Sequence, residues 1–261
     1  MIVALTGGTG FLGKLIFKKL KQNKIVVQNF DVRNRSNLNY FLKTIKRGRF
    51  DFVINSAANL SPKTDWDFNI NQNLPQKIQN SIIDCKTKLI HISTINITNK
   101  KFNDSYTNSK RVAESKLIKN DKLLILRPSL IIDKNFNISN NFFEKYTNLP
   151  FKHLPMIYPG SIYFPILDSC LADFIVSQIK RDKISNDIYN IIGKKEYKFW
   201  EIFNNFCKVK NKKALKINLN IFSKLKNKKM LNLFYKNSIL QNLIQLKRFK
   251  SCSNNGKFIK L

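Results

Sequence analysis

Thr6-Gly7-Gly8-Thr9-Gly10-Phe11-Leu12-Gly13 is the stretch from which the fold of this chain can be inferred. It follows a short apolar run at residues 1–5 and precedes a segment in which apolar side chains recur at helical spacing. A strand, a glycine-rich turn and an amphipathic helix, in this order, are typical of a dinucleotide site, in which the helix N-terminus faces the phosphates. The stretch therefore predicts cofactor contacts from Gly7, Thr9, Gly10, Phe11, Leu12 and Gly13.

The composition predicts a folded protein with a substantial core. The chain has 261 residues, of which 43% are hydrophobic, including 21 Phe. No run of 18 apolar residues occurs, and the first expected strand begins at residue 1, which leaves no room for a signal peptide. The four cysteines show no Cys-x-x-Cys spacing, so neither a metal site nor a disulfide framework is expected. A cytoplasmic location fits these features best.

The charge is strongly basic, with 47 Lys and Arg against 16 Asp and Glu, a net charge of +31. Such a charge can indicate a polyanionic partner, but Lys, Asn, Ile and Phe all have A/T-rich codons, and we favour this compositional bias over a dedicated nucleic-acid site. Residues 208–261 contain fifteen Lys and Arg and no acidic residue. Their interspersed apolar residues predict basic helices that complete a lobe, with peripheral membrane contact as the alternative.

Further apolar runs predict a parallel sheet with helices between its strands. Strands are expected at 25–31, 52–59, 88–92 and 123–126, and helices at 36–47 and at 66–83, the second interrupted near Pro75. This alternation predicts an α/β fold, a Rossmann-type doubly wound parallel sheet with a small, mostly helical C-terminal substrate lobe. We expect the cofactor domain at 1–135, and late sheet elements, the lobe and the basic helices at 136–261.

The ends of these strands carry the other candidate cofactor residues. Asp31 stands 18 residues after Gly13, where a carboxylate could hold a ribose, and Val32 follows it. Arg33 is close enough to meet a 2′-phosphate instead, so NAD and NADP both stay open. The small residues Ala57 and Ala58 suit a crevice that a ligand crosses.

A second group of residues predicts acid–base chemistry. The strand at 88–92 ends in Ser93-Thr94, and we interpret His91 within it as a packed strand residue. Tyr106 and Lys110 are four residues apart at the start of a predicted helix, so their side chains share a face. A neighbouring ammonium group favours phenolate, which predicts a lowered pKa for Tyr106.

These motifs together resemble the extended short-chain dehydrogenase/reductase family, in particular its nucleotide-sugar epimerases and dTDP-4-dehydrorhamnose reductases. The resemblance implies that Tyr106 is the general acid/base, that Lys110 binds the nicotinamide ribose and tunes Tyr106, and that Thr94 holds the reacting oxygen, with Ser93 as the second candidate. It also implies that Asn71 and Pro128 lie at the cofactor. The implied activity is NAD(P)-dependent oxidoreduction or epimerisation of a nucleotide-activated sugar in polysaccharide biosynthesis, and a homodimer stays open.

Two departures from the family pattern bear on the substrate. Tyr106 follows Thr94 by only twelve positions, about half the usual distance, so the substrate pocket is expected to be reduced or altered. Ile95-Asn96 follows Thr94 where the dehydratase branch has Asp-Glu, which disfavours 4,6-dehydration. The alternative is a weakly active or non-catalytic dinucleotide-binding protein of the same fold, with RNA or a membrane surface as its partner.

Overall fold

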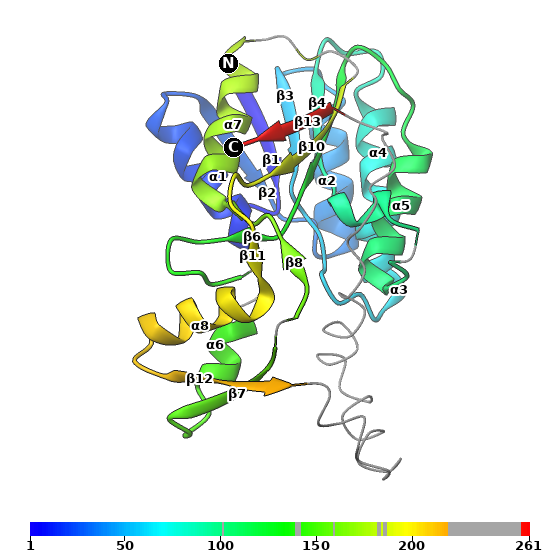
Figure 1. Ribbon diagram of the computed structural model, residues 1–261. Coiled ribbons are helices and arrows are strands. Elements are labelled where there is room, and N and C mark those ends of the chain that lie inside the picture. The colour runs from blue at the N-terminus through cyan, green and yellow to red at the C-terminus, as the bar shows by residue number, and fades with distance from the viewer. Residues whose placement is uncertain (101, 139–141, 159, 182–183, 185–186, 219–256) are drawn as a thin grey trace.

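A seven-stranded parallel sheet forms the centre of the computed structural model (Figure 1). The structure describes all residues except 101, 139–141, 159, 182–183, 185–186 and 219–256. The strand order is β13-β10-β5-β4-β3-β1-β2, so after β2 the chain crosses back past β1 to β3 and then continues toward the other edge. The strands are β1 (Ile2–Thr6), β2 (Val26–Phe30), β3 (Phe52–Asn55), β4 (Lys88–Ile92), β5 (Leu123–Pro128), β10 (Asp187–Ile192) and β13 (Lys257–Lys260).

Helices cover both faces of this sheet. One face packs against α1 and α7 through buried residues such as Ile16 and Ile175, and the other packs against α2 and α4 through Phe41 and Ile78. The arrangement confirms the predicted doubly wound α/β fold. The helices are α1 (Phe11–Gln22), α2 (Arg35–Ile45), α3 (Asp65–Phe68), α4 (Leu74–Ser81), α5 (Ser105–Lys116), α6 (Phe142–Thr147), α7 (Asp168–Arg181) and α8 (Phe199–Val209), with a 3₁₀ turn at Ile95–Thr98.

The helix expected over 66–83 is divided into three parts. A π-helical turn, Asn69–Asn73, separates α3 from α4. Pro75 does not break the segment, because it lies in the first turn of α4, where a missing N–H leaves no hydrogen bond unmade. The irregular turn lies next to α5 and thus close to the residues with predicted acid–base roles.

A smaller lobe lies below the carboxyl ends of the sheet strands in Figure 1. Its parallel ribbon, β7 with β12, packs with α6 and α8 around Phe143, whose ring centroid lies 5.2 Å from that of Phe203 and 5.3 Å from that of Phe206. Two short pairs, β6 with β9 and β8 with β11, connect the lobe to the sheet. These strands are β6 (Ile131–Ile132), β7 (His153–Tyr158), β8 (Ile162–Tyr163), β9 (Ile166–Leu167), β11 (Tyr197–Lys198) and β12 (Lys213–Asn218).

The second half of the chain contributes to both parts. After the lobe elements β7 and α6, the chain returns to the sheet as β10, and it returns again as β13. Most of the predicted basic C-terminal helices fall at 219–256, outside the described residues. Within the described ranges, no helix is both long and apolar enough to cross a membrane.

Candidate functional site

The glycine-rich turn connects β1 to α1 so tightly that side chains are excluded at two positions. Gly7 has φ +77°, and a Cβ there would lie 2.6 Å from the Ala57 backbone nitrogen. A Cβ on Gly13 would lie 2.0 Å from the carbonyl oxygen of Gly7, so α1 packs directly on the turn. Gly10 is the N-cap of α1 and offers no capping side chain. The first N–H groups of α1 are therefore left for an anionic ligand at the positive end of the helix dipole.

A cavity of about 390 Å³ opens in front of this turn, at the carboxyl ends of β1, β2 and β3. Of the predicted cofactor residues, it is lined by Gly7, Thr9, Gly10, Asp31, Val32, Arg33, Ala57 and Ala58. Its wall also includes three residues that the sequence did not single out, Gly8, Asn29 and Trp66. The indole nitrogen of Trp66 is buried without a hydrogen-bond partner among the described residues.

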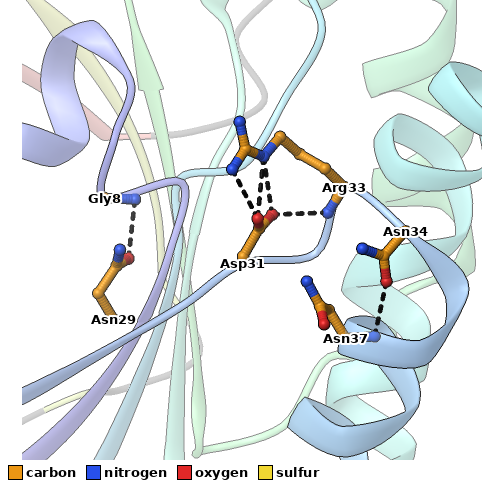
Figure 2. A network of polar contacts seen from close by, with 6 residues as sticks. All are labelled: Gly8, Asn29, Asp31, Arg33, Asn34 and Asn37. Atoms are coloured by element: carbon orange, nitrogen blue, oxygen red, sulfur yellow. Dashed lines mark hydrogen bonds and ion pairs between the residues drawn. The ribbon is translucent and has the colours of Figure 1, made fainter.

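The two charged side chains at the end of β2 bind each other (Figure 2). Arg33 Nε lies 3.0 Å from both carboxylate oxygens of Asp31, and Arg33 Nη2 lies 2.7 Å from Oδ2. These hydrogen bonds hold the pKa of Asp31 below its usual value. Two residues earlier, Asn29 Oδ1 accepts a hydrogen bond of 3.1 Å from the Gly8 backbone nitrogen, which connects β2 to the glycine turn.

A second cavity, of about 290 Å³, continues from the first one. Gly10, Ser56, Ala58 and Leu60 line both, so the two form one cleft along the ends of the strands. The remaining predicted residues on its wall come from α1, β4, α5 and β5. They are Phe11, Leu12, Gly13, Ser93, Thr94, Tyr106, Lys110 and Pro128. Tyr163 of β8 reaches the same cavity from the lobe side and was not predicted, because a two-residue strand gives no recognisable sequence pattern.

Lys110 is buried and directed toward the backbone of β4. Its Nζ donates a 2.8 Å hydrogen bond to the Ile92 carbonyl oxygen and lies 6.0 Å from the centroid of the Tyr106 ring. Burial lowers the pKa of Lys110 to about 8, and the negative charge of Glu114, one helical turn further on, opposes this shift. The ammonium group is therefore protonated at neutral pH, with a pKa only slightly higher.

The predicted lowering of the Tyr106 pKa was wrong. Loss of hydration raises the pKa of the Tyr106 phenol well above its usual value, and the nearby Asp104 carboxylate raises it further. The reason is geometric: the ammonium group faces the Ile92 carbonyl and does not offset the burial of the phenol. Tyr106 therefore carries a proton at neutral pH.

Thr94 and Ser93 stand at the end of β4 on the same wall. The Thr94 hydroxyl oxygen caps the 3₁₀ turn by accepting a 3.3 Å hydrogen bond from the Asn96 nitrogen. The Ser93 hydroxyl is buried and has no partner among the described residues. Both hydroxyls are thus placed along the cleft with hydrogen-bonding capacity that a substrate or cofactor oxygen could use.

Asn71 does not line either cavity. It is buried in the π-helical turn, where its Oδ1 accepts from the Asn59 nitrogen and its Nδ2 donates to the Asn59 oxygen, both at 2.8 Å. Nδ2 also lies 3.0 Å from the Ser109 hydroxyl oxygen, and that hydroxyl donates to the Tyr106 carbonyl. Asn71 thus connects the loop at the first cavity to the helix of Tyr106.

Two sets of buried polar groups lie under the cleft, and the sequence predicted only the first of them. His91 is fully buried with a pKa well below its usual value, which agrees with its interpretation as a packed strand residue, and its Nδ1 lies 3.3 Å from Asn55 Nδ2. The ion pair of Glu114 with Arg127 was not predicted: Arg127 Nε lies 3.1 Å from both carboxylate oxygens. It ties α5 to β5 behind Lys110.

The described residues contain no cluster of three or more His, Cys, Asp or Glu side chains that could hold a metal ion.

Solved structures share this architecture. The chain is similar to a dTDP-4-dehydrorhamnose reductase from Clostridium acetobutylicum (20% identity, 85% of each chain covered, TM-score 0.69). It is also similar to a dTDP-4-dehydrorhamnose reductase from Bacillus anthracis in complex with NADP (20% identity, 85% of each chain, TM-score 0.67). A UDP-N-acetylglucosamine 4-epimerase from Bacillus cereus has 18% identity over 84% of this chain and 85% of its own, with a TM-score of 0.63.

The chain has the fold of these nucleotide-sugar enzymes. No protein-family model matches the chain, and no curated protein sequence is similar to it. At 20% identity or less the likeness concerns the fold, and the activity has to be argued from the cleft.

Proposed function

We propose that this chain is a member of the extended short-chain dehydrogenase/reductase family. In this proposal it is an NAD(P)-dependent enzyme that reduces or epimerises a nucleotide-activated sugar. Residues 1–135 would bind the cofactor, and the lobe within 136–261 would bind the sugar nucleotide. The observation that carries the proposal is the shared wall of Thr94, Tyr106 and Lys110 in a cavity continuous with the glycine turn.

The cleft fits a dinucleotide. The glycine turn leaves the helix N-terminus open to a pyrophosphate, and the 390 Å³ cavity beside Asp31 and Trp66 has the size and polar groups expected for an adenosine. Asp31 could accept hydrogen bonds from ribose hydroxyls, and Arg33 could meet a 2′-phosphate. Because these side chains bind each other, either cofactor would have to compete with that ion pair.

The protonated Tyr106 phenol is a candidate acid for the reduction of a carbonyl group. A bound nicotinamide would supply or accept a hydride, which is chemistry that the protein itself lacks. Tyr106, protonated at neutral pH, would donate its proton to the oxygen of a substrate carbonyl, while Thr94 hydrogen-bonds that oxygen. Lys110 would hold the ribose hydroxyls and remain cationic near the developing charge. An epimerase would need the same three residues, and the choice between the two activities depends on whether the reduced product leaves.

The experiment is the substitution Tyr106→Phe, assayed with NADH or NADPH and dTDP- or UDP-linked 4-keto sugars. Removing the proton donor should lower kcat by about 10²–10⁴-fold, the range that general acid catalysis contributes. Cofactor affinity should change little, because the phenyl ring keeps its place. Trp66 lies in the first cavity, so its fluorescence in a Trp200→Phe background reports cofactor binding separately. Unchanged turnover would refute the role of Tyr106, and no cofactor binding by the parent protein would refute the family proposal.

A further inference from the structure

The end of the lobe farthest from the sheet carries an unusual surface. It consists of residues 148–153, from the end of α6 to the first residue of β7, and residues 208–213, from the last turn of α8 to the first residue of β12; we call these two segments the lobe tip (Figure 1). They lie side by side, because β7 and β12 pair in register from His153 and Lys213 onward. None of the lobe-tip residues lines either cavity of the cleft.

Three large apolar side chains of the lobe tip face outward. Phe151 is 63% exposed, Val209 50% and Leu149 41%. Single exposed apolar residues are ordinary on a protein surface, but a cluster on two adjacent turns marks a contact surface. The lobe core lies underneath and is filled by other residues, so these three are not needed to close it.

The turns that present these side chains are held in place by the backbone and one lysine. Lys212 Nζ donates to the carbonyl oxygens of Leu149 and Phe151, at 2.6 Å and 3.2 Å. Asn211 has φ +53°, which turns the chain sharply between α8 and β12. The apolar side chains therefore protrude from a fixed surface and are not the ends of a loose loop.

The charge around them has one sign. The lobe tip contains five lysines and no acidic residue; the lysines are Lys152, Lys208, Lys210, Lys212 and Lys213. One of these lysines has an acidic neighbour outside the tip: Lys210 Nζ lies 3.9 Å from the carboxylate of Glu144 in α6. Exposed apolar side chains on segments rich in lysine complement a surface that has negative head groups above a hydrocarbon layer.

We propose that the lobe tip docks the protein on a membrane surface that contains anionic phospholipid, with Phe151 and Leu149 entering the acyl boundary. A second copy of the chain would not suit this surface, because it would bring equal lysine clusters together. Nucleic acid fits less well, because single-stranded binding uses aromatic platforms and arginine, and the tip has one aromatic residue and no arginine. The docked surface leaves the cleft open, so the proposal does not depend on the proposed enzymatic function.

The test is sedimentation of the full chain with vesicles of equal parts phosphatidylglycerol and phosphatidylcholine, and with phosphatidylcholine alone. We expect binding to the anionic vesicles that weakens at high salt, because the lysine contribution is screened. Phe151→Ser keeps every charge, including those at 219–256, and should lower the partition coefficient about tenfold or more. The matched control is Ile118→Ser. Ile118 is a 57% exposed apolar residue just beyond α5, and the Ile118→Ser variant should bind the vesicles as the parent protein does.

Several outcomes would overturn the proposal. If Phe151→Ser binds the vesicles as tightly as the parent protein, the charge alone carries the binding and the tip does not dock. The proposal is also excluded if the parent protein does not bind anionic vesicles at low salt. It is excluded as well if RNA displaces the protein from the vesicles and binds the Phe151→Ser variant as tightly as the parent protein. Far-UV circular dichroism and thermal melting verify folding of each variant. Tryptophan fluorescence gives an independent readout. Brominated acyl chains should quench the fluorescence of the tryptophan introduced by Phe151→Trp but not that of the tryptophan introduced by Ile118→Trp.

Discussion

Lys110 keeps an ammonium group inside the cleft wall, where the Ile92 carbonyl oxygen is its hydrogen-bond partner. Burial lowers its pKa to about 8, whereas an unfolded chain would give about 10.4. Between these two pH values the unfolded state binds more protons, so the free energy of unfolding should rise as the pH rises through this window. Below pH 8, burial of the charge costs about 3 kcal/mol, at 1.36 kcal/mol per pKa unit.

This cost predicts a pH-dependent difference between the parent protein and Lys110→Met. Methionine fills similar space without a charge. The free energy of unfolding of the variant should therefore exceed that of the parent protein most below pH 8, and this difference in unfolding free energy should shrink by about 3 kcal/mol toward pH 10.4. Urea denaturation at several pH values measures it. Lys43→Met, at an exposed position of α2, is the control and should show a flat difference. A flat difference for Lys110→Met would contradict the proposed burial of the charge.

At the scale of elements, the contact between α1 and the glycine turn depends on a missing side chain. A Cβ on Gly13 would lie 2.0 Å from the Gly7 oxygen, so Gly13→Ala has to push α1 away from β1. We expect a clear drop in melting temperature and loss of dinucleotide binding. Gly48→Ala is a useful comparison, because Gly48 has φ +68° but lies near Cys85, away from the cleft. It should lose about 1 kcal/mol of stability through backbone strain and keep its cofactor affinity.

The ion pair between α5 and β5 predicts a second element-scale effect. Glu114 and Arg127 are both almost fully buried, with an Nη2–Oε2 distance of 2.5 Å. Removing only the carboxylate, in Glu114→Ala, leaves a buried guanidinium without its anion and should cost about 3–5 kcal/mol. The double variant Glu114→Leu/Arg127→Met should be less destabilised than Glu114→Ala, which denaturant unfolding can measure. A double variant that is the least stable of the set would show that the pair itself stabilises the fold.

Sequence predicted the elements whose patterns are local. The strand at 88–92, the glycine turn and the helix that begins near Tyr106 each have an apolar run, a turn residue or a helical period of their own. The short lobe strands could not be predicted, because two-residue strands such as β8 exist only through their partners. The site was predictable where strands end, but Asn29, Trp66 and Tyr163 reach the cleft by tertiary packing that no spacing reveals.

At the scale of the whole molecule, cofactor binding should stabilise the entire fold, because the cleft is made from the ends of several strands of one sheet. A ligand at 100 times its Kd adds about 2.7 kcal/mol to the free energy of unfolding. Thermal melting with increasing NAD and, separately, NADP should therefore raise Tm in a saturable way. The cofactor that acts at the lower concentration is the preferred one. AMP alone should give a smaller shift, and the absence of any shift with both dinucleotides would contradict the proposed site.

The order of strands in the sheet has a consequence for how the chain is made. β10 pairs with β5 along one edge, and within the described part of the chain its other edge pairs with β13, at residues 257–260. When the residues of the glycine turn, the cleft and the lobe have been synthesised, the residues of β13, which pairs with this edge, have not yet been added. Until Lys257–Lys260 emerge, nascent chains expose the unpaired backbone of β10 to one another, and on a crowded polysome such an edge is a place for wrong pairing.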